Sequence, residues 1–136
     1  MESTIKENQT SDVIFVDSTC TINDLQHIHN YKQKKIITFD YDSHILLSRN
    51  NIQHEISDNY LLKSEFPEIQ NISYKFSNWY EEKLISEKLT FEGINLGKLF
   101  YVEFHYFLVP IIKKLFELTK IMNQFHKSIF HANYSL

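Results

Sequence analysis

Short apolar runs rich in β-branched residues alternate with stretches of helical periodicity along this chain, and this alternation restricts its fold most strongly. Asp12–Asp17 and Ile36–Asp40 are runs typical of strands buried on both faces. A more polar third run covers Ile52–Ile56, and Ser128–Ala132 is expected to begin a fourth strand. Strands separated by helices predict parallel pairing with right-handed crossovers. We therefore expect an α/β fold, with a small, mostly parallel sheet flanked by helices on both faces.

The first two helices are expected to begin at polar capping residues. One follows Ser18 or Thr21 and is expected to end in the positive charges of Lys32–Lys35. The next is short and is expected to be capped by Asp42 or Ser43. Both helices would connect neighbouring parallel strands.

The middle of the chain is expected to be mainly helical. A third helix is predicted to start at Ser64, with Pro67 in its first turn, where proline is tolerated. Residues 81–92 are expected to be helical in parts and irregular near Thr90–Gly93.

A long apolar helix is predicted near the C-terminus. Asn95 is expected to cap it, and Pro110 is expected to kink it by removing one backbone donor. Its second half carries a charged face that we expect to be solvated, made of Lys113, Lys114, Glu117 and Lys120. The apolar stripe over residues 96–125 has two interpretations: it packs on the sheet, or it forms an interface with a second domain or a second copy.

Length and composition set the domain organisation that we expect. The 136 residues suit one domain, which we place at 12–136 as a Rossmann-like α/β domain after a disordered leader, 1–11. Because the chain stops just after a candidate strand, we expect it to be the N-terminal half of a larger protein. A formal net charge of −3 and a single arginine, Arg49, argue against nucleic-acid binding. No apolar run is long enough to span a bilayer, so we expect no transmembrane segment and a cytoplasmic location.

The small numbers of glycine and cysteine residues exclude several classes of site. With two glycines and neither G-x-G-x-x-G nor a P-loop motif, the chain does not fit a dinucleotide or P-loop enzyme. The lone Cys20 excludes an internal disulfide and a cysteine-based zinc site. The seven histidines show no metal-ligand spacing, so we predict neither a metal nor a cofactor.

Polar residues follow each of the first three predicted strands. Because the carboxyl ends of parallel strands share one edge, these residues are candidates for binding a substrate there. The candidates are Asp17, Ser18, Asp42, Asp58 and Tyr60. The alternative is that Asp, Ser and Asn residues at these positions only cap helices and form turns.

His44 is the first candidate for catalysis at this edge. A histidine at the start of a helix, held by a nearby carboxylate such as Asp40 or Asp42, can act as a general base toward a hydroxyl. The alternative is a histidine that is hydrogen-bonded to a neighbouring loop.

The segment Leu89–Phe104 holds both glycines of the chain, Gly93 and Gly97, around Asn95. Free backbone N–H groups at this helix start are expected to hold an anion or a sugar hydroxyl, which makes Asn95 a binding candidate. Glu92 is the second acid/base candidate. The alternative is a tight turn followed by a close helix contact at Gly97.

The chain also resembles a known enzyme family, on the succession IITFDYDSH, ISDNYL, an aromatic helix ending near NWY, and LTFEGINLGKLFYVEF. The resemblance is to the N-terminal domain of two-domain, GT-B-like glycosyltransferases of microbial surface-polysaccharide assembly. It implies an acceptor-binding domain that meets a C-terminal nucleotide-sugar domain across a cleft, toward which Asp17, Asp42, His44, Asp58 and Glu92 would face.

In such an enzyme the implied reaction is inverting transfer, in which His44 or Glu92 deprotonates the acceptor hydroxyl. The resemblance implies a sugar or glycan acceptor as partner and a location at the inner face of the membrane. Because the donor domain is missing, the chain alone would be inactive. The competing hypothesis is a non-catalytic α/β interaction module that forms a homodimer through the helix 96–125.

Overall fold

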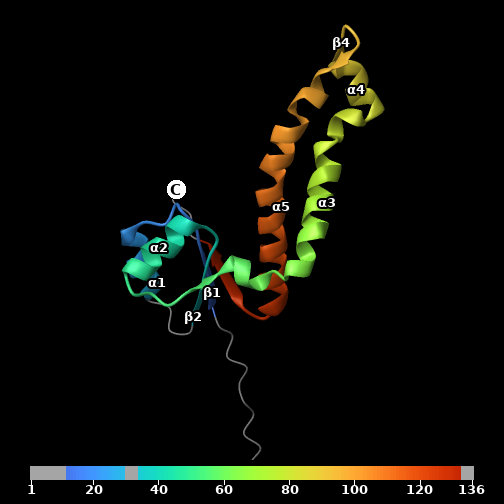
Figure 1. Cartoon of the computed structure of the whole chain (residues 1–136). Coiled ribbons are helices and arrows are strands. Elements are labelled where there is room, and N and C mark those ends of the chain that lie inside the picture. Colours follow the sequence, from blue (N-terminus) through green and yellow to red (C-terminus); the bar gives the residue numbers. More distant parts are fainter. Residues whose placement is uncertain (1–11, 30–33, 133–136) are drawn as a thin grey trace, which may run out of the picture. The chain divides into compact units, whose positions relative to one another are not determined.

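The computed structural model describes residues 12–29 and 34–132 (Figure 1). The expected leader, 1–11, lies outside the described residues, as do Tyr31 and Lys32 at the expected end of the first helix. The chain divides into two compact units. The sheet unit contains the residues up to 59 and those from 121 onward, and the helical unit contains residues 60–120.

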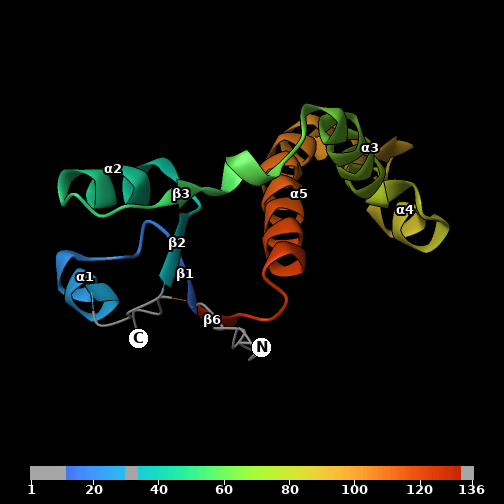
Figure 2. The ribbon, with the colours of Figure 1, turned by 90° about the horizontal axis from the view of Figure 1, so that it is seen from below.

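The sheet unit is built on four strands that all run in parallel, in the order β3-β2-β1-β6 (Figure 2). The strands are β1 (Asp12–Val16), β2 (Lys34–Thr38), β3 (Glu55–Ile56) and β6 (Ile129–Ala132). The two central strands, β1 and β2, pair along their full length. The short strand β3 pairs only with Ile37 and Thr38, the last two residues of β2. The predicted α/β fold with a parallel sheet is thus confirmed.

Two helices form the crossovers of this sheet. They are α1 (Ile22–His29), between β1 and β2, and α2 (Tyr41–Arg49), between β2 and β3, and both lie on one side of the sheet (Figure 2). The core on that side is apolar, because alternate residues of each strand face the helices. It consists of Ile14, Val16, Cys20, Leu25, Ile28, Ile36, Leu47 and Ile52.

The opposite side of the sheet carries aromatic residues. Phe15 of β1 points away from the α1–α2 side, since it alternates with Ile14 and Val16. Its ring centroid lies 5.3 Å from that of Phe39 and 5.6 Å from that of Phe130 in β6. These rings join three neighbouring strands through their side chains.

Several predicted boundaries in the sheet unit are wrong by a few residues. Lys34 and Lys35 begin β2 and do not close α1. The cap of α2 is Asp40 and not Asp42 or Ser43, because Asp40 has extended backbone angles and its carboxylate accepts a hydrogen bond from the Ser43 N–H. The third strand is shorter than Ile52–Ile56.

The helical unit contains three helices and a two-stranded hairpin. Its helices are α3 (Phe66–Ser77), α4 (Lys83–Leu89) and α5 (Tyr101–Gln124), with short 3-10 turns between them. The last four residues of α5 are assigned to the sheet unit. Pro67 lies in the first turn of α3, as predicted, and Pro110 lies inside α5.

The hairpin was not expected, since residues 90–93 were predicted to be irregular. Strands β4 (Thr90–Phe91) and β5 (Ile94–Asn95) pair antiparallel around a two-residue turn, Glu92-Gly93. Both turn residues have positive φ, 48° and 81°, which is the geometry of a type I′ turn. The sequence signal is weak because glutamate rarely occupies the first of these positions.

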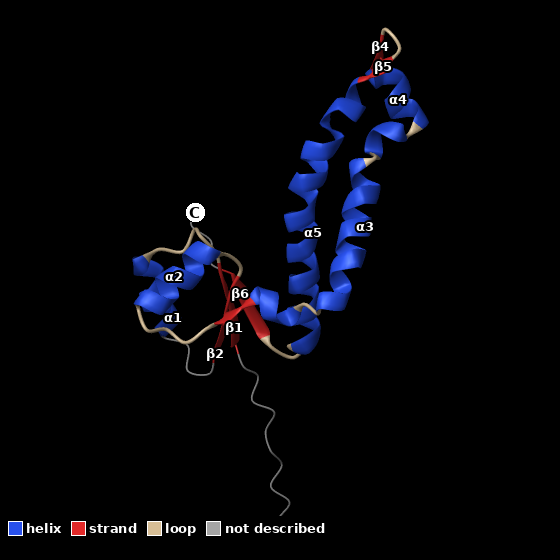
Figure 3. Cartoon of the chain, in the orientation of Figure 1, coloured by secondary structure: helices blue, strands red, loops and turns tan. Residues whose placement is uncertain are grey.

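Helices α3 and α5 lie side by side (Figure 3). The α3 face toward α5 holds small buried side chains, Ser73 and Ser77, which permit a close approach. Tyr74 on α3 contacts two rings of α5: its centroid lies 5.9 Å from Tyr101 and 6.5 Å from His105. One face of α5 is therefore occupied by α3.

Candidate functional site

The carboxyl edge of the sheet brings the polar ends of β1 and β2 together. The Ser18 N–H donates to Asp40 Oδ2 at 2.7 Å, and the Phe39 N–H donates to the Val16 carbonyl at 3.1 Å. Asp17 immediately precedes Ser18, and Asp42 lies in the first turn of α2. The parallel topology thus places Asp17, Ser18 and Asp42 at one edge, as the alternation of strands predicted.

At this edge, the carboxylates that follow β1 and β2 accept hydrogen bonds from nearby residues. Asp17 Oδ1 accepts from the Thr19 N–H at 2.9 Å and from the Thr19 hydroxyl at 2.5 Å. Asp40 Oδ1 accepts from the Ser43 N–H at 2.8 Å, which caps α2. These are the turn and capping roles of the alternative interpretation.

Two of the remaining candidates follow β3. Asp58 is exposed in the 3-10 turn Ser57–Tyr60, which continues directly from that strand. Tyr60 is the first residue of the helical unit. Their proposed contact with a substrate stays a prediction.

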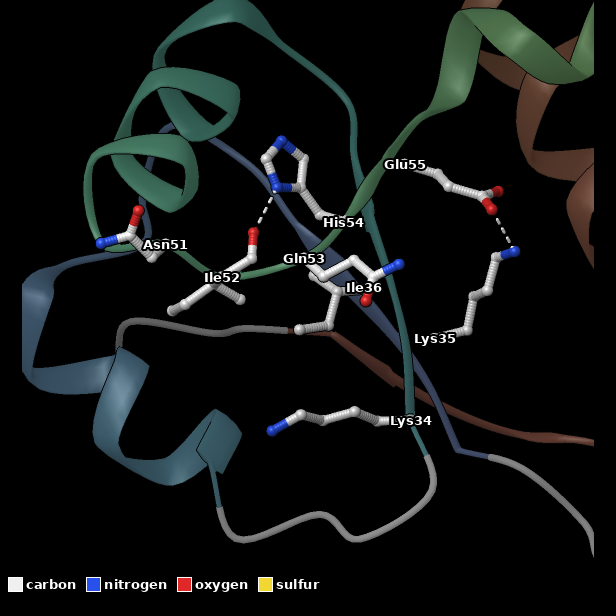
Figure 4. A pocket seen from close by; sticks show the side chains of 8 residues that line it. All are labelled: Lys34, Lys35, Ile36, Asn51, Ile52, Gln53, His54 and Glu55. Atoms are coloured by element: carbon white, nitrogen blue, oxygen red, sulfur yellow. Dashed lines mark hydrogen bonds and ion pairs between the residues drawn. The ribbon is translucent and has the colours of Figure 1, made fainter.

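His44 is held by a second histidine. His44 Nδ1 lies 2.8 Å from His54 Nε2, and His54 Nδ1 lies 2.8 Å from the Ile52 carbonyl (Figure 4 shows the second contact). A carbonyl only accepts, so His54 Nδ1 donates to it, and in neutral His54 the Nε2 atom then accepts from His44 Nδ1. Both rings are half-buried, and their tautomers follow from this chain of hydrogen bonds.

This arrangement gives His44 the geometry of a positioned base. In neutral His44 the proton lies on Nδ1, which leaves the Nε2 lone pair for a proton or a ligand. We expected Asp40 or Asp42 to hold the ring, whereas the described hydrogen bond of the ring is made to His54. No sequence pattern predicts this pair, because the two histidines are ten residues apart and one of them precedes a strand.

The second acid/base candidate, Glu92, lies in the helical unit. It is the first residue of the β4–β5 turn and its side chain is exposed. The turn fixes the position of its backbone, and among the described residues no ion pair holds its carboxylate. Its catalytic role stays a prediction.

The side-chain amide of Asn95 makes hydrogen bonds through both its oxygen and its nitrogen, in the segment that leads into the long helix. Its Oδ1 accepts from the Gly97 N–H at 2.9 Å, and its Nδ2 donates to Ser86 Oγ at 3.0 Å and to the Tyr80 carbonyl at 3.3 Å. A β-carbon on Gly97 would lie 2.3 Å from Tyr80 Cβ. Asn95 therefore caps the 3-10 segment Leu96–Phe100, which leads into α5, whereas we expected it to cap the long helix itself. Gly97 makes the close contact that the alternative interpretation describes.

Cys20 is buried at the end of the β1–α1 connection. Burial, with a smaller effect of Asp24 and Asp17, raises the pKa of the Cys20 thiol to about 11. The thiol therefore stays protonated and unreactive at neutral pH. Within residues 12–29 and 34–132, no group of three or more His, Cys, Asp or Glu side chains is placed to hold a metal ion.

The charged residues of α5 do not form the solvated face that we expected. Glu117 is fully buried, and its carboxylate lies 3.1 Å from Lys113 Nζ and 3.0 Å from Lys114 Nζ. A buried carboxylate is tolerated only when such partners compensate its charge. The side chain therefore belongs to the packed part of the helix.

Comparison with known proteins gives no match: no family model fits the sequence, and no curated protein or solved structure is significantly similar to it. The α/β fold is thus shown by the structure alone, and the resemblance to glycosyltransferases stays a hypothesis. In the described part of the chain, no helix has both the length and the apolar character needed to cross a bilayer.

Proposed function

We propose that this chain is a self-associating interaction module, in which the helical unit pairs with the helical unit of a second copy. The observation that carries this proposal is the distribution of apolar side chains. Among the described residues, 16 of the 21 exposed large apolar side chains belong to the helical unit. Only two of the 13 buried hydrophobic residues, Ile69 and Tyr80, belong to it.

The exposed side chains include an ordered stripe along α5. Phe107, Ile111 and Leu115 follow one another at four-residue intervals and are 61%, 40% and 53% exposed. Phe104 precedes them on the same side, and its ring stacks on that of Phe107 with centroids 6.3 Å apart. Side chains three and four apart share one helix face, so this stripe suits packing against another helix.

The exposed apolar area is large enough for a dimer. The 16 side chains are between 40% and 73% exposed. Even without Val102, which lies on another side of α5, they leave on the order of 1,000 Å² of apolar surface in water, since an aromatic side chain alone can bury about 200 Å². A standard interface buries about 800 Å² on each partner. Two hairpins of α3 and α5 would together form a four-helix bundle, which is a common solution for such surfaces.

Charge favours a second copy over a charged partner. Residues 60–120 contain eight basic and eight acidic residues, so this unit carries no formal net charge. Anionic lipids and nucleic acids are recognised through an excess of Lys and Arg. A neutral apolar surface instead favours association with a surface of the same kind.

Light scattering of three proteins tests this proposal. The wild type is expected to have the mass of a dimer, and Phe107→Asp that of a monomer, because a carboxylate in the stripe would be buried without a partner. Val102→Asp is the matched control, since Val102 is 52% exposed on the same helix but five residues away, about 140° around it. A monomeric wild type, or equal dissociation of both variants, contradicts the proposal.

A second candidate is the acceptor-side domain of a glycosyltransferase. It is favoured by the parallel sheet, whose carboxyl edge holds Asp17, Ser18 and Asp42. Close to this edge, His44 on α2 is hydrogen-bonded to His54. His44→Ala and Glu92→Ala, assayed for sugar transfer from nucleotide-sugars to glycan acceptors, test this candidate. Loss of turnover in either variant with unchanged folding supports it, and unchanged turnover in both excludes these catalytic roles.

A further inference from the structure

A pocket of about 470 Å³ opens beside β2, away from the carboxyl edge, and it does not depend on the proposed self-association. The start of β2, Lys34–Ile36, forms one wall, and residues 51–55 form the other (Figure 4). The pocket exists because the β2–β3 ladder begins only at the pair Ile37 and Glu55. The segment before β3, which we expected to be a strand, lies apart from β2.

The wall formed by residues 51–55 is held in place by hydrogen bonds. The Asn51 and Ile52 N–H groups donate to carbonyls of α2, at 3.1 Å to Ser48 and 3.0 Å to Leu47. His54 is fixed at both ring nitrogens, by the Ile52 carbonyl and by His44. Because these contacts involve α2 itself, the pocket is organised before any ligand binds.

The lining combines an apolar floor with cationic side chains. Ile36 and Ile52 are buried, at 3% and 8% exposure. Lys35 forms an ion pair with Glu55, so its charge is compensated. Asn51 and Gln53 add exposed amide groups at the entrance. Such a mixture of apolar surface and few polar groups is typical of small-molecule sites.

Lys34 carries a positive charge in this pocket, and no described carboxylate compensates it. Its half-buried ammonium donates to the Ile28 carbonyl at the end of α1 and has no carboxylate partner among the described residues. Two further N–H donors remain on that nitrogen. Burial lowers the pKa of Lys34, which is the effect expected of an ammonium removed from water without a counter-charge.

We propose that this pocket binds a small organic anion, whose carboxylate or phosphate contacts Lys34 Nζ and whose apolar part lies on Ile36 and Ile52. The anion supplies a counter-charge that no described carboxylate provides to Lys34. Gln53 and Asn51 provide amide donors for the remaining oxygens.

An NMR titration of the whole chain with phenyl phosphate at constant ionic strength tests this proposal. Saturable shifts are expected for the backbone amides of residues 34–36 and 51–55. Inorganic phosphate should bind more weakly at the same residues, because it lacks an apolar part, and phenol should not saturate them. No saturable shift of these amides with phenyl phosphate overturns the proposal, as does equal binding of phenol.

Amino-acid substitutions test whether Lys34 is the cation that binds the anion. Lys34→Met is expected to weaken phenyl phosphate binding at least about tenfold, whereas Lys63→Met, which removes an exposed lysine of the helical unit, should leave it unchanged. Gln53→Glu places a negative charge at the entrance without removing a described contact, so it tests the site even if Lys34→Met folds poorly. Equal affinity of Gln53→Glu and the wild type contradicts the proposal.

Discussion

Glu92 has a left-handed backbone conformation, φ 48°, which is strained for a residue with a β-carbon. Asparagine adopts this conformation more readily at the first position of a type I′ turn. We predict that Glu92→Asn raises the free energy of unfolding by roughly 0.5–1 kcal/mol, as measured by urea denaturation. Glu87→Asn on α4 is the control and should not stabilise the chain. No gain in stability for Glu92→Asn would be inconsistent with the turn geometry.

Gly97 lies where only a hydrogen atom fits. A β-carbon there would lie 2.3 Å from Tyr80 Cβ, which is close to the backbone and cannot move away alone. Gly97→Ala should therefore lower the free energy of unfolding by about 1–3 kcal/mol. The exposed neighbour Lys98, changed to alanine, should have little effect. Equal stability of the two variants would show that this contact is not required.

At the scale of single elements, Asp40 connects two of them through one carboxylate. It caps α2 through the Ser43 N–H and accepts from the Ser18 N–H beyond β1. Asp40→Ala should lower the free energy of unfolding by about 1–2 kcal/mol, as measured by denaturation. Asp42→Ala removes an exposed carboxylate from the same first turn and should cost about 0.3–0.5 kcal/mol. The reverse order would contradict the capping role of Asp40.

An ion pair between Lys120 and Glu65 joins the start of α3 to the α5 helix. The hydrogen bond from Lys120, with a second from the Leu62 N–H, lowers the pKa of Glu65 below its ordinary value of 4.5. The folded state therefore prefers the ionised form. The resulting stabilisation is present above pH 4.5 and is lost as the pH falls through the lowered folded-state value.

We predict that Glu65→Gln reduces the loss of stability on acidification, measured by denaturation between neutral pH and pH 3. Glu68→Gln, which removes an exposed carboxylate from the same helix, is the control and should keep the wild-type dependence. A Glu65→Gln curve parallel to that of the wild type would argue against the ion pair.

At the scale of the whole molecule, the parallel sheet was predictable because its strands are buried. β1 and β2 are runs of β-branched residues, which is typical of strands covered on both faces. The start of β3 was not predictable, because residues 51–54 are held by α2 and by the contact of His54 with His44. Such contacts form only once the fold brings distant side chains together.

The candidate sites also differ in whether they could be predicted from the sequence. The carboxyl edge with Asp17 and Ser18 follows from parallel topology and was predicted, although its carboxylates mainly serve turns and caps. The pocket beside Lys34 was missed, because it depends on a gap between chain segments and no motif marks it. The apolar character of α5 was visible in the sequence, but which of its faces stays exposed was not.

Self-association would cover the apolar surface of the helical unit with the same surface of a second copy. Sedimentation equilibrium of the wild-type chain over a range of concentrations measures this most directly. We predict a mass of twice 16.3 kDa that falls toward 16.3 kDa only on dilution. A mass of 16.3 kDa at every concentration would contradict it.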